Sequence, residues 1–470
     1  MMTAYRHPAY RSLPEQVAVF RPAQTVFGAS AASVTTSAGE TLPLADPRVT
    51  VLIPSMGETA AQMLAAVFES EGFSAVAHPA ADEAILKLGR AHTACKECLP
   101  LILTAGTLIH YVRELRRPGE IVAYFMPTGS GPCRFGQYAV FMEDLIRRLE
   151  IPDVAVVSLT SENSYAGTNA FFRLRAWWAA VISDALEDIR SLILVRADDP
   201  RRGMDIFAGE SRRLVSVLGQ KDFRTVLAAL EASLGRLAAV PGLDRPHPHL
   251  PVVALIGEIF VRRDDLARRH LIEILARRGF AVVCSPVSEW ILYTNYLVRK
   301  NIVRHHLPTL ERLKLLLVER YVGHYTRALR RVLRQSGLGP ADPIDIDGIL
   351  RHARPFLSPH LTGEAILTIG SALSEIATSV CGVISIGPFG CMPGRLAEAI
   401  LTDAMRSPVK TALTPGNRAL KKILADFDEL PFLPIESDGS PFPQLLEAKL
   451  DAFCLGASRL KEAMAGPQRR

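Results

Sequence analysis

The sequence lacks an apolar run long enough to cross a membrane. Its most apolar stretch, Leu99–Val112, is interrupted by Gly, Thr and His before it reaches the roughly 20 residues that a spanning helix needs. The N-terminal residues also lack the apolar core of a secretory signal. We therefore expect a cytoplasmic protein with no membrane association.

Cysteine is scarce, and two common functional signatures are absent. The seven cysteines are an odd number spread over 470 residues, which argues against a disulfide framework and favours reduced thiols or metal ligands. There is no GxxxxGK[ST] phosphate loop and no basic motif interleaved with aromatic residues. We therefore do not expect this chain to hydrolyse ATP or to bind nucleic acid.

The formal charge of +6 is small for this length, and paired arginines are scattered along predicted helices. We expect most of these pairs to lie on solvated helix faces, although a basic pocket could hold the phosphates of a carrier such as coenzyme A. The pairs are Arg147–Arg148, Arg201–Arg202, Arg262–Arg263 and Arg268–Arg269.

From Arg48 onward, short buried-strand patterns alternate with helical ones. This alternation predicts an α/β fold of two doubly wound, mostly parallel-sheet domains with helical insertions. Within it, VKTALTP at 409–415 is predicted as a short strand. The predicted boundaries are 1–45 for an extended N-terminal arm, 46–168 for the first α/β domain, 169–250 for a helical segment and linker, 251–300 with 376–470 for the second α/β domain, and 301–375 for a helical insertion.

Three cysteines share one backbone setting. Cys98, Cys133 and Cys391 each follow an apolar stretch and open a segment with helical periodicity, so each thiol is expected at a helix N-terminus, where the dipole favours thiolate. Neighbouring glycines and prolines make tight turns in which backbone amides can approach sulfur. Because ligands of parallel sheets bind beyond the carboxyl ends of the strands, we predict an iron–sulfur site with these three ligands in the cleft between the domains.

Other interpretations of the cysteines stay open at this stage. Cys95 and Cys98 form a CxxC pair, which without a second pair is weak evidence for zinc and is equally typical of a redox dithiol. The three motif thiols are alternatively buried and incidental. Cys284, Cys381 and Cys454 are expected to pack as small apolar residues.

Several polar residues are candidates for chemistry beside the thiols. Arg134 and Gln137 follow Cys133 and are predicted to hydrogen-bond a cluster or a substrate, with an ordinary helical turn as the alternative. Glu258, Glu289 and Asn295 lie near predicted strand ends, where a carboxylate or amide serves as acid, base or substrate anchor. Helix capping is the alternative role for these three residues.

Seven motifs in a fixed order resemble a known family. HTACKECLP, FMPTGSGPCRFGQY, GEIFVRRDD, SEWILYTNY, GEAILTIG, PFGCMPG and IESDGSPFPQ occur between about residues 48 and 460. They are similar to the D-component-like segment of 2-hydroxyacyl-CoA dehydratases, in particular to its version in CoA-substrate-specific enzyme activases. The resemblance covers almost everything but the N-terminal arm.

The resemblance implies ligands, a cofactor and partners. Cys98, Cys133 and Cys391 match the motif cysteines, whereas Cys95 stands where glycine is common. In related dehydratases three cysteines bind a [4Fe–4S] cluster, and some relatives hold a fused double-cubane cluster instead. The resemblance also implies low-potential electrons from an ATP-dependent activator protein, and an acyl-CoA or another small molecule as substrate. The implied protein is a homo- or heterodimeric, anaerobic dehydratase-like lyase or reductase. The alternative is a non-catalytic cluster- or zinc-stabilised electron-transfer or scaffold subunit.

Overall fold

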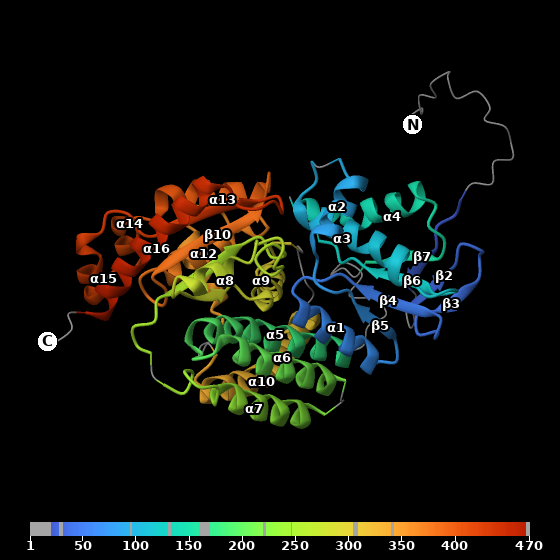
Figure 1. The fold of residues 1–470 in the computed structure, drawn as a ribbon, viewed down its shortest axis with the longest axis horizontal. Helices are drawn as coiled ribbons and strands as arrows, with labels where there is room; N and C mark the ends of the chain where they lie inside the picture. Colours follow the sequence, from blue (N-terminus) through green and yellow to red (C-terminus); the bar gives the residue numbers. More distant parts are fainter. Residues whose placement is uncertain are drawn as a thin grey trace, which may run out of the picture.

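Two four-stranded parallel sheets with flanking helices dominate the chain (Figure 1). The structure is a computed structural model that describes residues 20–27, 32–94, 96–129, 133–158, 170–219, 222–245, 247–303, 309–339 and 343–466. The predicted fold class, α/β with two parallel-sheet domains and added helices, is confirmed.

The first sheet has the order β5-β4-β6-β7. Its strands are almost wholly buried because helices cover both faces, which is why they read as short continuous apolar runs. Its strands are β4 (Val49–Ile53), β5 (Ser74–Ala77), β6 (Ile121–Phe125) and β7 (Val154–Val157). The helices are α1 (Glu58–Ser70), α2 (Glu83–His92), α3 (Leu99–His110), the π-helix η1 (Tyr111–Leu115), the 3-10 helix η2 (Arg134–Gln137) and α4 (Tyr138–Arg148).

The second sheet repeats the same topology, with the order β11-β10-β8-β9. In both sheets the first strand along the chain lies between the second and the third, so the switch points fall between β4 and β6 and between β8 and β10. Its strands are β8 (Val252–Gly257), β9 (Ala281–Cys284), β10 (Gly382–Pro388) and β11 (Phe432–Ser437). Its helices are α8 (Leu271–Arg277), α9 (Val287–Arg299), α11 (Ile346–Ala353), α12 (Ala365–Glu375), α13 (Met392–Ala404), α14 (Ser407–Leu413), α15 (Arg418–Ile423), η3 (Leu424–Asp426) and α16 (Gln444–Ala465).

Four long helices form a unit below the sheets in Figure 1. The helix α10 packs on α5 and α7, and their apolar side chains share one core with α1 and the first sheet. The predicted insertion at 301–375 is therefore divided: α10 joins the helical unit, whereas α11 and α12 belong to the core of the second sheet. The helices of the unit are α5 (Ala170–Arg196), α6 (Pro200–Leu218), α7 (Phe223–Ala238) and α10 (Thr309–Ser336).

The N-terminal segment differs from the predicted extended arm at 1–45. Its described part forms a three-stranded antiparallel sheet of β1 (Gln24–Phe27), β2 (Ala32–Thr35) and β3 (Thr41–Pro43). The Thr25 hydroxyl donates to the Val156 carbonyl at 2.6 Å, beside the first parallel sheet. Strands of three or four residues have too little alternation to be recognised from sequence alone.

The stretch 409–415, predicted as a strand, is mostly helical instead. The helix α14 begins at Ser407 with a proline in its first turn, a position where the missing N–H costs no hydrogen bond. Lys410 on this helix is fully buried and donates to the carbonyls of Leu373 and Ser374 at 2.6 and 3.1 Å. The lysine thus caps the C-terminal end of α12.

The arginines of the turn after β8 are buried, which corrects the expectation of solvated faces. Arg262, Arg263 and Arg268 are 4%, 6% and 1% exposed. Arg263 pairs with Asp184 at 2.7 Å and Arg268 with Glu187 at 2.6 Å, both acids lying on α5. The second sheet docks on α5 through these pairs, and docking removes the arginines from water.

A buried carboxyl at this junction predicts how stability changes with pH. Asp188 on α5 accepts the N–H of Cys284 at 3.0 Å, and burial raises its pKa to about 7. A carboxyl whose pKa is raised in the folded state contributes stability that is fully present below its unfolded pKa, about 4, and is lost as the pH rises through about 7. The loss amounts to on the order of 4 kcal/mol at about 1.4 kcal/mol per pKa unit.

We therefore expect the free energy of unfolding to fall between about pH 4 and pH 7 in the native chain, and to fall less in Asp188→Asn. Denaturant unfolding followed by circular dichroism measures this difference. Asp205→Asn, at an exposed position on α6, is the matched control and should titrate like the native protein. An Asp188→Asn variant with the native pH dependence would contradict the assignment.

Candidate functional site

The carboxyl ends of the two sheets face each other across a short distance. Gly57 follows β4 with φ +85, and a Cβ added to it would lie 3.4 Å from the carbonyl oxygen of Arg263 in the turn after β8. The turns beyond the two switch points are therefore packed together. The region beyond the carboxyl ends of the strands is where open parallel sheets bind their ligands.

The three motif cysteines begin helices near this contact between the domains, and the helix N-terminal positions are as predicted. Cys98 is the N-cap residue of α3, Cys133 of η2 and Cys391 of α13. Cys133 follows β6 and Cys391 follows β10, so two of the cysteines come from switch-point strands of different domains. The chain thus brings thiols that are far apart in sequence to one inter-domain surface.

Each thiol sulfur accepts a backbone N–H from the first turn that follows it. The N–H of Phe135 points to Cys133 Sγ at 3.5 Å, and the N–H groups of Leu101 and Gly394 do the same for Cys98 and Cys391. A Cβ on Gly394 would lie 3.3 Å from Cys391 Sγ, so glycine permits this close approach. Amide groups directed at sulfur stabilise a thiolate once it forms.

Burial outweighs the helix termini in setting the thiol pKa values, which corrects our expectation of ready thiolates. Cys98 is buried, Cys391 is half-buried and Cys133 is exposed, but the protein atoms around each sulfur displace enough water to raise the pKa of Cys133 to about 11 and of Cys391 to about 12, and also to raise that of Cys98. The charge of Glu258 further raises the pKa of all three. The three thiols therefore lie around one carboxylate, and each remains protonated at neutral pH in this ligand-free form.

Glu258 is held rigidly between the two switch-point strands. Its Oε2 accepts the N–H groups of Phe260 and Val261 at 3.1 and 2.8 Å, and its own N–H donates to the Ile386 carbonyl at 2.9 Å. Gly257 precedes it with φ +106, and a Cβ there would lie 2.1 Å from that carbonyl oxygen. Only glycine allows β8 to end so close to β10. Burial raises the pKa of Glu258 despite the two N–H donors, which favour its charged form.

Cys98 has one further partner close to its sulfur. The hydroxyl of Tyr138, at the start of α4, lies 2.5 Å from Cys98 Sγ. Arg134 ties the same two segments together because its Nη1 donates to the Lys96 carbonyl at 2.9 Å. These two contacts fix the positions of the helices that begin at Cys98 and Cys133 relative to each other.

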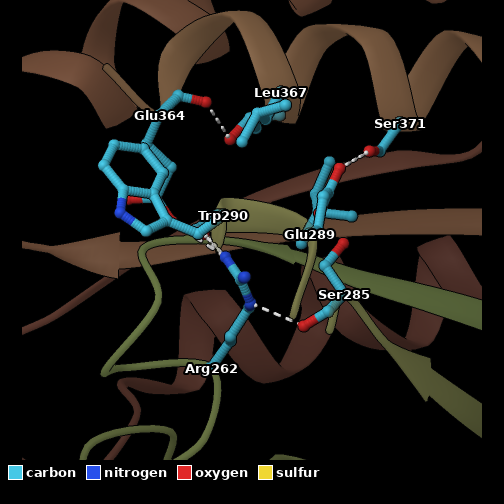
Figure 2. A pocket seen from close by; sticks show the side chains of 10 residues that line it. Arg262, Ser285, Glu289, Trp290, Glu364, Leu367 and Ser371 are labelled. Carbon is cyan, nitrogen blue, oxygen red and sulfur yellow. Dashed lines mark hydrogen bonds and ion pairs between the residues drawn. The ribbon is translucent and has the colours of Figure 1, made fainter. Parts of the chain in front are cut away.

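A small polar cavity of about 10 Å³ lies next to Glu258, at the ends of β8 and β9. This volume is close to what a single water needs. Arg262 spans it, donating from Nε to the Ser285 carbonyl at 2.9 Å and from Nη1 to Glu364 Oε1 at 2.8 Å (Figure 2). Across the cavity the Ser371 hydroxyl donates to Glu289 Oε1 at 2.8 Å.

The remaining predicted site residues divide between the cavity and the surface. Glu289 lines the cavity and is 3% exposed, whereas Asn295, two turns later on α9, is not among its lining residues. Gln137 is exposed at the start of α4 and makes no side-chain cap there. Cys95 lies outside the described residues, so its relation to the site stays a prediction.

Sequence reasoning missed the residues that join the thiols to the cavity. Arg262 belongs to a pair that was expected on a solvated helix face, and no sequence pattern connects it with Glu364, the N-cap residue of α12. Ser371 was not considered at all. A signal was present, because Glu364, Thr368, Ser371 and Glu375 recur at helical spacing in a helix whose one further polar residue is Ser374.

Two other polar clusters stand apart from this site. The ligand atoms of Asp265, His270 and Glu273 lie within 4.8 Å of one another, but Arg190 and Arg268 already pair with the two acids, so ion pairs account for the cluster. On α10 a groove of about 190 Å³ opens between arginines, whose charges attract anions. The groove is lined by Arg327, Arg330, Arg331, Arg334 and Pro343.

Within the described ranges, none of the helices has both the length and the apolar character that a membrane span requires. Comparisons with known proteins found no match, either to a protein-family profile or to a curated sequence. The residues around Glu258 are therefore the basis on which a function is proposed.

Proposed function

We propose that this chain binds an iron–sulfur cluster through Cys98, Cys133 and Cys391. The observation that carries the proposal is the arrangement of three thiols from three helix N-termini around one carboxylate, each thiol with a backbone N–H directed at its sulfur. The three thiols and their N–H donors fit an iron–sulfur cluster, because soft thiolate ligands and amide hydrogen bonds to sulfur are typical of iron–sulfur sites. A [4Fe–4S] or double-cubane cluster would supply one-electron chemistry at an iron that no protein thiolate holds.

The proposed activity is a reductive or radical reaction of the dehydratase type, with electrons from an ATP-dependent activator. Glu258 and Glu289 would hold or release protons beside the substrate. The anchoring role of Asn295 stays a prediction, because this residue does not line the cavity. The substrate would be an acyl-CoA or another small molecule. We place the protein in the cytoplasm as a homo- or heterodimer.

The second candidate is a non-catalytic cluster- or zinc-stabilised subunit that transfers electrons or scaffolds an assembly. Three thiols alone fit this role as well. The buried carboxyls beside the thiols favour the enzyme, because a purely structural site gains nothing from Glu258 or Glu289 and loses stability by burying them.

Anaerobic reconstitution with iron and sulfide tests the proposal. We expect comparable amounts of bound iron and acid-labile sulfide per chain, brown absorbance, and an EPR signal on reduction. Proton release should accompany uptake, because thiols that are neutral in the apo-protein must ionise to bind metal. Zinc without sulfide would support the second candidate, and failure to bind either would refute both.

A further inference from the structure

One face of α12 carries polar residues from the cysteine site to the protein surface. Glu364 caps the helix, and Thr368, Ser371 and Glu375 follow at intervals of four, three and four residues, which places all four on the same side. Apart from Ser374, the rest of α12 is apolar and buried. At about 1.5 Å per residue this polar face is about 16 Å long.

The inner half of the polar face lines the small cavity. Glu364, Thr368 and Ser371 are all lining residues, and Glu289 faces them from α9. Ser371 donates to Glu289, while Arg262 links Glu364 to the turn that holds Glu258 (Figure 2). Hydroxyl and carboxyl groups separated by room for about one water are the components of a proton relay.

The outer half of the polar face reaches solvent. Glu375 is partly exposed, and Thr378, one turn later, is exposed. The buried ammonium of Lys410 donates to the hydroxyl of Thr378 at 3.3 Å and interacts with the charge of Glu375. The face therefore has one end at the cysteine site and the other at the surface.

Carboxyl groups outnumber cations along this face, so some of them must hold protons at neutral pH. Glu364, Glu289 and Glu375 interact with Arg262 and Lys410 as cations. Surrounding protein atoms displace water from the carboxyls of Glu364 and of the partly exposed Glu375, and this desolvation raises the pKa of each to about 8. The charged groups that act on the three glutamates are Arg262 and Glu258 from the turn after β8, Asp184 and Asp188 from α5, Lys410 from α14, and the glutamates themselves.

We propose that the polar face of α12 is a proton path between the surface at Glu375 and Glu364 beside the cysteine site. In the direction of uptake, a proton enters at Glu375, passes through Glu289 and Ser371, and reaches Glu364. Each transfer breaks one O–H bond and forms another, so the side chains are unchanged after one passage. That the inner end serves a redox reaction rests on the proposed function; the path itself does not.

Infrared titration of the cluster-free chain tests the end points. A protonated carboxyl has a C=O stretch that a carboxylate lacks, so we expect two such bands that disappear with midpoints near pH 8, separate from those of Asp188 and Asp264, which disappear near pH 7. Glu364→Gln and Glu375→Gln should each remove one band, and Glu447→Gln, at an exposed position on α16, should remove neither. Absence of both bands at pH 6.5 would overturn the proposal.

A pH jump tests the connection between the end points. After a light-triggered proton release, the Glu364 band should recover at least tenfold more slowly in Ser371→Ala than in the native chain. Ser374→Ala is the matched control, since its hydroxyl donates to a carbonyl of its own helix, and it should recover at the native rate. Equal rates in the two serine variants would refute the path.

Failure of the proposed function would be distinguishable, because these measurements need no cluster. If the chain shows both bands and the Ser371 effect but binds no iron, the proton path is supported and the iron–sulfur assignment is refuted. If the chain binds iron but lacks the bands, the iron–sulfur assignment is supported and the proton path is refuted.

Discussion

Replacing Cys133 or Cys391 by serine is expected to abolish the cluster, whereas Cys284→Ser should keep it. Serine preserves the volume of the side chain but is a poor ligand for iron–sulfur centres. Both motif thiols lie around Glu258 and receive a backbone N–H. Iron and sulfide content per chain after anaerobic reconstitution measures the effect, and we expect a fall of more than tenfold in each motif variant.

Cys284 is a demanding control because it is buried close to the same turn. Its Sγ donates to the Arg262 carbonyl at 3.5 Å, and it sits at the end of β9. The variant therefore disturbs the neighbourhood without removing a proposed ligand. Circular dichroism of all three variants confirms that they fold. Full iron content in both motif variants would refute ligation by Cys133 and Cys391 and would leave a structural role for these thiols.

An ATP-hydrolysing activator should be required to reduce the cluster, and the chain alone should show negligible ATPase activity. The first expectation follows from the family resemblance and the second from the missing phosphate loop. Because 59 mV changes a one-electron equilibrium tenfold, a cluster of very low potential stays oxidised with mild donors, and coupling to ATP hydrolysis can change its reduced fraction by orders of magnitude. EPR of anaerobic mixtures measures that fraction.

Three control mixtures make this experiment decisive. Activator with a non-hydrolysable ATP analogue should leave the cluster oxidised. Activator and ATP should reduce it, and addition of an acyl-CoA should then change the EPR signal if the substrate class is right. Complete reduction by a mild donor would remove the need for an activator, and ATP hydrolysis by the isolated chain would reverse the assigned roles.

Much of the fold was predictable because its signals are local. The buried strands of both sheets and the helices between them appear in the sequence as short apolar runs and amphipathic periods. The same reasoning placed Cys98, Cys133 and Cys391 at helix N-termini, where the structure has them. It failed where a segment was short, as in the three N-terminal strands, or where a helix started with proline and lysine, as in α14.

The polar interior was not predictable, because it depends on which elements pack together. Arg262 and Arg263 look like surface residues in sequence, yet docking of the second sheet on α5 buries both. Glu364 and Ser371 come together with Glu289 only because α12 packs opposite α9 across the cavity. In each case the partner is more than 70 residues away along the chain, beyond the reach of any local pattern.

The sequence by itself determined that there are two α/β domains, that three cysteines lie at helix N-termini, and that thiols are the soft ligands available for a metal. These features depend on periodicity, turn residues and side-chain chemistry, which are local properties of each segment. Only the tertiary structure decided that the three thiols lie around Glu258 and that they are protonated without a metal. The reason is desolvation: the pKa of a thiol at a helix N-terminus depends on every group that excludes water from it, and those groups come from both domains.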